Sequence, residues 1–438
     1  MSGGRAWGWV AALRSGSTVG WQTWRAQGAD AEPFEIGAPG GSGAPSSTSS
    51  STSSSTSSST SSSTSSPTLP GAQQLALLRA VNTAAASTGR TVPRATADRV
   101  LAAGVSGRGR GDLPLLGADE EAEASRFGLR PVDPDTLPAG ELLRVAAGMI
   151  ADDVAATDPT RTEGGRPVRP GRPRNRPAGR AQQVLRRLLE ARRPGTPYVV
   201  LGPQWRCEAV RAGLVAAGRP PGGRRPVAYL LLDDLGTVLS QAWTARSFDQ
   251  GGLTWGEFLN TFVGSGRVPP RADLTRMARA AAQRYGAEQV RLVIDPAELA
   301  AELGVAALAE PPHLGANAVD LVRRVGEPLG ILVPPERRPE LLRATLLPRL
   351  SGLGGPTPTV PERHRPWLAT QAERTHHDLS AAGYPVLGDL DRLLVVPEPG
   401  APVRPTETAV MQLAVDLLLD PVGGPGGREG PGRPGAGT

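Results

Sequence analysis

The chain has 438 residues and a formal net charge of +6, and all 48 of its basic residues are arginine. The absence of lysine excludes a lysine-bearing phosphate loop and a Schiff base to a carbonyl or pyridoxal cofactor, because both need a lysine amine. The single cysteine, Cys207, excludes a disulfide or zinc framework within the chain, and we expect it to be a buried structural thiol.

Residues 1–45 contain the stretch WVAALRSGSTVGWQTWRAQGADAEPF (9–34). Its pattern predicts an apolar strand, a turn of small residues and a helix that opens around Trp21. Because the turn follows an apolar stretch, it is a candidate phosphate-binding loop, with an arginine where such loops carry lysine. The tryptophans of this region are more typical of a core than of a partner-binding patch. The loop residues are Arg14, Ser15, Gly16, Ser17 and Thr18.

Three segments have the composition of linkers or tails. Residues 46–70 are almost wholly Ser and Thr up to position 66, which predicts a disordered tether, with an O-glycosylated stalk as the alternative. Residues 157–180 are rich in Arg, Pro and Gly and predict a disordered interdomain linker. This segment could also attract nucleic acid, but it has no aromatic side chains to stack on bases, so specific nucleic-acid binding is not expected. Residues 423–438 form a Gly/Pro-rich tail, also expected to be disordered.

Similar segments recur in the same order on both sides of the second linker, which favours two tandem copies. The first copy, formed by 1–45 and 71–156, has the Ser/Thr tract where the second has a helix and a strand at 290–294. We therefore expect the first copy to be partial, mostly helical and unable to close a sheet by itself. The similarity sets Trp21 opposite Trp243, and it pairs 9–34 with 226–258, 75–104 with 319–348, and 137–154 with 404–422.

The second copy, residues 181–422, alternates apolar strands with helices. The short apolar runs 197–201, 227–232 and 290–294 predict buried strands of a parallel sheet. This alternation indicates an α/β fold, and from about residue 316 onward the pattern predicts helices alone. The helices predicted before that point are 181–193, 202–218, 236–247, 254–263 and 272–286.

Several phrases of this second copy resemble the sulfotransferase-like proteins of actinobacteria. The resemblance covers roughly 185–420, and AGYPVLGDLDRL (382–393) is its most distinctive phrase. It implies an incomplete sheet of the sulfotransferase or P-loop type, and transfer of a sulfuryl group from 3′-phosphoadenosine 5′-phosphosulfate to an alcohol or amine. The other phrases are VVLGPQW (199–205), VAYLLLDDLGTVLSQAW (227–243), LTWGEFL (253–259), GAEQVRLVIDP (286–296) and LGANAVDLVRRVGEPLG (314–330).

In that family the sulfuryl donor is held by a lysine-bearing loop and by an arginine at a strand end with a serine on the next helix. Here the strand ends in Leu232-Asp233-Asp234, and Ser240 follows at a suitable distance. The resemblance thus implies a donor-phosphate role for Ser240, but the arginine is missing, and an aspartate pair repels phosphate. The two aspartates are equally expected to cap the following helix. The only candidate for the loop is the segment at 14–18.

The sequence therefore predicts a degenerate sulfotransferase-like protein, non-catalytic or weakly active, with no assignable catalytic residue and no required cofactor. One alternative is an active sulfotransferase that uses 3′-phosphoadenosine 5′-phosphosulfate, and another is a basic interaction protein that acts through 157–180. The sequence names no partner: the positive charge could indicate an anionic ligand, but arginines spread along the chain are more typical of a solvated surface. No metal is expected, because the adjacent His376 and His377 point in different directions on a helix. No signal peptide or membrane span is apparent, so we expect a cytoplasmic protein.

Overall fold

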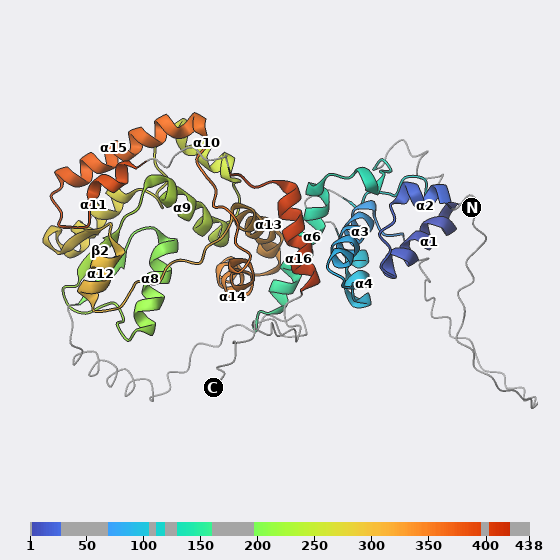
Figure 1. Cartoon of the computed structure of the whole chain (residues 1–438), viewed down its shortest axis with the longest axis horizontal. Coiled ribbons are helices and arrows are strands. Elements are labelled where there is room, and N and C mark those ends of the chain that lie inside the picture. Colours follow the sequence, from blue (N-terminus) through green and yellow to red (C-terminus); the bar gives the residue numbers. More distant parts are fainter. Residues whose placement is uncertain are drawn as a thin grey trace, which may run out of the picture. The chain divides into compact units, whose positions relative to one another are not determined.

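The computed structural model describes two compact units, Met1–Val145 and Ala146–Thr438 (Figure 1). The predicted helix 181–193, the predicted disorder of 46–66 and of most of 157–180, and the tail 423–438 lie outside the described residues. The described residues are 2–27, 69–104, 111–118, 129–159, 197–395 and 403–420.

The second unit contains a four-stranded sheet in which all strands run parallel in the order β1-β2-β3-β4. Its first three strands are the apolar runs predicted from the sequence: β1 (Tyr198–Leu201), β2 (Val227–Leu231) and β3 (Val290–Val293). The fourth, β4 (Val386–Leu387), pairs with β3 in a region predicted to be wholly helical, and that prediction was wrong. The unit is thus a mixed α/β structure with a parallel sheet.

The helices between the strands follow the predicted pattern. Gly218, predicted to close α8, has the positive φ of 74° that suits glycine beyond a helix end. Thr254 opens α10 with a reciprocal capping box to Glu257. The helices are α8 (Gln204–Ala216), α9 (Leu235–Asp249), α10 (Trp255–Ser265), α11 (Leu274–Tyr285) and α12 (Pro296–Leu303).

The remainder of this unit is mainly helical. Short 3₁₀ turns η2 (Ala287–Gln289), η3 (Glu362–His364) and η4 (Leu390–Leu394) join its longer elements. Helix α13 packs on α9, α14 and α16, and α15 packs on α9 and α11. These helices are α13 (Ala316–Leu332), α14 (Arg338–Ser351), α15 (Arg365–Ala381) and α16 (Glu407–Leu419).

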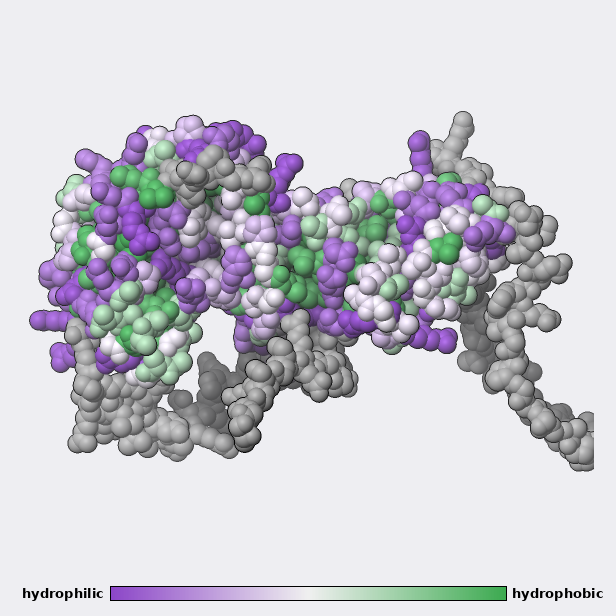
Figure 2. All heavy atoms as spheres, in the orientation of Figure 1, coloured by the Kyte–Doolittle hydropathy of each residue, from purple (hydrophilic) through white to green (hydrophobic). Residues whose placement is uncertain are grey.

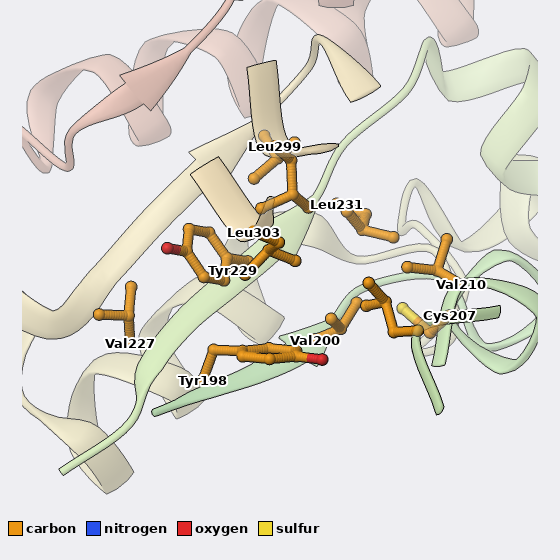
Figure 3. Packing of buried hydrophobic residues seen from close by; sticks show 11 residues of the cluster. Tyr198, Val200, Cys207, Val210, Val227, Tyr229, Leu231, Leu299 and Leu303 are labelled. Atoms are coloured by element: carbon orange, nitrogen blue, oxygen red, sulfur yellow. The ribbon is translucent and has the colours of Figure 1, made fainter. Parts of the chain in front are cut away.

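One face of the sheet is covered by α8 and α12. Cys207 and Val210 of α8, together with Leu299 and Leu303 of α12, meet alternate side chains of the strands, including Tyr229 (Figure 3). Helix α11 packs against β2 and β3. Because the side chains of β2 are buried on both faces, it has the continuous apolar sequence that predicted a central strand. On the face shown in Figure 2, hydrophilic residues cover much of this unit and hydrophobic ones are interspersed among them.

The first unit is helical in its described residues. A helix, α1, stands where a strand was predicted before the turn at 14–18, so that prediction was wrong. Trp9, Val10 and Leu13 are buried and lie on one side of α1, as helical spacing requires. This explains why the short apolar run forms a helix and not an extended strand. Its elements are α1 (Ser2–Arg14), α2 (Trp21–Gln27), α3 (Ala72–Ser87), α4 (Arg94–Ala102), η1 (Pro134–Thr136) and α6 (Ala139–Ala156), whose last turns belong to the second unit.

Each unit contains a similar tryptophan hydrogen bond that starts from one of its helices. In the first unit, Trp9 of α1 donates its indole N–H to the carbonyl of Val19, ten residues later, at 3.0 Å. In the second, Trp243 of α9 donates in the same way to Leu253, also ten residues later and at 3.0 Å. By this contact, α1 corresponds to α9 and Trp9 corresponds to Trp243. The sequence had instead set Trp21 opposite Trp243.

A second tryptophan contact opens the following helix in each unit. Trp21, the first residue of α2, donates its indole N–H to the carbonyl of Leu116 at 2.9 Å. Trp255, the first residue of α10, donates to that of Thr359 at 2.9 Å. The ring of Trp21 lies 5.1 Å from that of Trp9, and the corresponding ring distance in the second unit is 5.5 Å. Helix α2 therefore corresponds to α10.

The next helix also begins alike in both units. The amide of Ala72, at the start of α3, donates to the carbonyl of Leu113 at 2.8 Å. The amide of Ala316, at the start of α13, donates to that of Pro356 at 2.8 Å. Helices α3 and α13 therefore begin alike, and they lie in the segments 75–104 and 319–348 that the sequence similarity sets opposite each other.

Candidate functional site

A cavity of about 1170 Å³ lies in the second unit. Its walls are the first half of α9, the first turn of α10, and the inter-element segments 311–314, 357–363 and 403–405. Three residues separate the end of β2 from the start of α9, so the first turns of α9 lie at the carboxyl edge of the sheet. Open parallel sheets bind ligands at this edge, and pockets of this size accept small molecules.

The polar lining of the cavity contains groups without protein partners. The hydroxyls of Thr237, Ser240 and Thr357 line it, and none of them hydrogen-bonds to another described residue. The Oε1 atom of Gln241 is buried and unpartnered within the described part of the chain. Hydroxyl and amide groups both donate and accept hydrogen bonds, so this wall suits a ligand with several polar groups.

Charged side chains also line the cavity. Asp320 is nearly inaccessible and binds Arg324, whose Nε lies 2.8 Å from its carboxylate, while Arg324 also reaches Glu407 at 3.4 Å. Arg404 lines the cavity and is exposed, and it forms no ion pair with any residue that the structure describes. Arg363 contributes a further guanidinium. The cavity therefore presents at least one positive charge that the surrounding side chains leave unneutralised.

The structure supports a role for Ser240 as a cavity residue but places an ion pair at the strand end. Arg206 of α8 donates from Nη1 to Asp233 at 3.0 Å and to the carbonyl of Leu232 at 2.8 Å. Burial raises the pKa of Asp233, and Arg206 opposes this shift. Asp234 caps α9 by accepting from the amide of Thr237 at 2.9 Å, as one reading of the sequence predicted. Among the described residues, the arginine found at this strand end is Arg206, and it is paired.

The predicted phosphate loop belongs to the first unit, whereas Ser240 belongs to the second. The loop follows α1 rather than a strand. The amides of Ser15, Gly16 and Ser17 donate to the last carbonyls of α1, so they close the helix instead of pointing at a ligand. Arg14 pairs with Asp98 at 3.0 Å. These four residues and Thr18 therefore lack the strand–loop–helix geometry that a phosphate loop needs.

The other reactive side chains have structural surroundings. Cys207 is fully buried, and burial raises the pKa of its thiol to about 11, as a structural cysteine requires. His376, on α15, pairs with Asp391 at 3.0 Å. Within the described residues no group of three His, Cys, Asp or Glu side chains is arranged to hold a metal ion.

Sequence reasoning found Ser240 but missed most of the cavity. Its walls come from segments far apart in the chain, such as 311–314 and 403–405, which have no periodic pattern. Arg404 next to Pro405 was the available signal in one of them, but adjacent arginine and proline recur throughout this chain.

None of the helices within the described residues combines the length and the apolar character required to cross a lipid bilayer. Comparison with family models, curated proteins and solved structures gives no significant match to this chain.

Proposed function

We propose that this chain is a sulfotransferase-like protein that binds an anionic small molecule and does not transfer sulfuryl groups. The observation that carries the proposal is the pairing of Arg206 with Asp233 near a cavity lined by Ser240 and by Arg404, which has no ion-pair partner among the described residues. The pair of Arg206 and Asp233 leaves no net positive charge at the end of β2, where a donor phosphate would need a cation. The cavity keeps polar groups and positive charge without lysine, a metal cluster or a phosphate loop among the described residues.

The absence of donor binding is testable by calorimetry with 3′-phosphoadenosine 5′-phosphate, the product form of the donor. Each missing charge-assisted contact costs about 1.5–3 kcal/mol, so we expect no binding at micromolar concentrations. Asp233→Arg returns a guanidinium to the strand end near Ser240 and is expected to strengthen binding at least about tenfold. The exposed Glu336→Arg makes the same change in net charge elsewhere and is the control. Micromolar binding by the unmodified protein would instead favour the active sulfotransferase.

Binding in the cavity is testable with two glycine variants of α10. A Cβ at Gly256 or at Gly264 meets no atom within 4 Å, but only Gly256 lines the cavity. Gly256→Phe therefore fills the cavity with little strain, and Gly264→Phe adds the same side chain outside it. In a thermal-shift screen of anionic metabolites, we expect stabilising ligands that lose their effect in Gly256→Phe and keep it in Gly264→Phe. A screen without any such ligand would contradict the proposal.

A further inference from the structure

The first unit holds one of its own carboxylates at a helix start. Asp135 of η1 accepts hydrogen bonds from the amide of Trp21 at 3.3 Å and from that of Gln22 at 3.2 Å, the first two residues of α2. Arg79 of α3 also donates to this carboxylate. The amides at a helix start carry partial positive charge and lack partners within the helix, so a carboxylate there is stabilised.

The corresponding helix start of the second unit opens into the cavity. Trp255 and Gly256, the first two residues of α10, line the cavity, and their amides donate to no other described residue. The capping box of Thr254 and Glu257 satisfies only the neighbouring amides, at the cap and at the third residue. The amides of Trp255 and Gly256 correspond to the two that hold a carboxylate in the first unit, but they have no hydrogen-bond partner among the described residues.

The side chains that supply the carboxylate differ between the units. In both, a backbone bond precedes this region: Leu116 N to Val132 O at 3.0 Å, and Thr359 N to Val403 O at 3.2 Å. Counting onward from these carbonyl residues, Arg404 corresponds to Asp133, and Thr406 corresponds to Asp135. The second unit has therefore lost the internal carboxylate and has gained an exposed guanidinium on the cavity wall.

Local geometry sets where a carboxylate fits. Gly20, before α2, has no Cβ, and one built there would lie 2.8 Å from the Asp135 carboxylate. Its counterpart Thr254 has a Cβ, so a ligand in the second unit must sit closer to Gly256. A Cβ at Gly256 meets nothing within 4 Å, so there is room beside that amide. Arg404 also lines the cavity and supplies a positive counter-charge.

We infer that the cavity binds a small hydroxylated carboxylic acid, with its carboxylate on the amides of Trp255 and Gly256 and with Arg404 as counter-ion. The hydroxyls of Thr237, Ser240 and Thr357 would bond the hydroxyl groups of that acid. This inference rests on the proposed function, because it specifies the anion that the cavity takes.

The test uses the full chain labelled with ¹⁵N-tryptophan, which has eight such residues. D-glucuronate is the probe, D-glucose is its neutral counterpart, and D-glucose 6-phosphate is a different oxyanion. We expect glucuronate to shift the backbone amide signal of Trp255 saturably, glucose to leave it in place, and neither to move the Trp21 signal. The Trp255→Phe variant assigns the signal, and Asp135→Asn gives the direction of the shift that loss of an amide–carboxylate contact causes.

A charge variant supplies the second readout. We expect Arg404→Gln to weaken glucuronate binding about tenfold, because a charge-assisted contact is lost. Arg267→Gln, at an exposed position outside the cavity, is expected to leave it unchanged. The inference is overturned if glucuronate or glucose 6-phosphate binds in the cavity, as judged by Gly256→Phe, while the Trp255 amide stays in place. It is also overturned if glucose shifts that amide equally. In those outcomes the proposed function stands. It fails if no anion in the screen binds the cavity, or if the unmodified protein binds 3′-phosphoadenosine 5′-phosphate at micromolar concentrations.

Discussion

At the scale of single residues, ion pairing decides what the carboxyl edge of the sheet can bind. Arg206 provides a guanidinium near the place where the resembling family has one, but it comes from α8 and its charge is committed to Asp233. Its side chain is 12% exposed and that of Asp233 is 35% exposed, so the pair is partly withdrawn from solvent. A guanidinium whose charge is already matched by a carboxylate has less attraction left for a phosphate. Arg404, exposed and unpaired among the described residues, has the opposite character.

His364 gives a prediction for the pH dependence of stability. Burial, and then the charge of Arg363, lower the pKa of this histidine below its usual value of 6.5. As the pH falls below 6.5, the unfolded chain takes up a proton that the folded chain refuses, so this residue makes the free energy of unfolding smaller. The loss continues until the pH reaches the lower pKa of the folded state.

The His364→Gln variant removes this proton uptake. We expect urea unfolding to show a smaller decrease in stability between pH 7.5 and pH 5.5 in the variant than in the unmodified protein. His377→Gln, on the exposed part of α15, is the control, and its pH dependence should match that of the unmodified protein. Equal decreases in all three proteins would show that His364 titrates normally in the folded state.

At the scale of elements, the sequence predicted those whose side chains follow one clear pattern. Strands β1 and β2 are continuous apolar runs, and β3 is apolar except for Arg291. The helices between them have recognisable caps. Strand β4 has only two residues, with Val386 37% exposed, so it lacks the apolar run that identifies a buried strand. The apolar run in α1 resembles a strand until Trp9 and Leu13 are seen to share a helix face. The cavity could not be predicted, since its walls meet only in the folded chain.

Strand β4 depends on a close backbone approach at Gly388. This glycine has a φ of 99°, and a Cβ there would lie 2.8 Å from the amide nitrogen of Asp295, which follows β3. We expect Gly388→Ala to lower the free energy of unfolding by about 2–3 kcal/mol, from backbone strain together with this contact. Gly383→Ala is the matched control, because that glycine also has a positive φ but open space around its Cα. A loss no larger than that of the control would mean that β4 tolerates the added methyl group.

At the scale of the whole molecule, the same tryptophan contacts stabilise two different units. In the second unit, α9 and α10 pack within an assembly that includes a parallel sheet. In the first, α1 and α2 form a helical core around Trp9 and Trp21, and no strand is assigned among its described residues. Asp135 accepts hydrogen bonds from the first amides of α2 in the first unit, whereas the start of α10 in the second unit lines the cavity. The comparison therefore favours a structural role for the first unit and ligand binding in the second.

Separate cores predict separate effects of equivalent substitutions. Trp9→Phe leaves the carbonyl of Val19 without its indole donor, and Trp243→Phe does the same to that of Leu253. Each change should cost about 1–3 kcal/mol, because a partly buried acceptor loses its hydrogen bond. In calorimetric unfolding we expect Trp9→Phe to lower one transition temperature and Trp243→Phe to lower another. Trp24→Phe, at a partly exposed position of the first unit, should have a smaller effect. If both core variants shift a single common transition, the two units unfold as one cooperative structure, and the first stabilises the cavity-bearing unit directly.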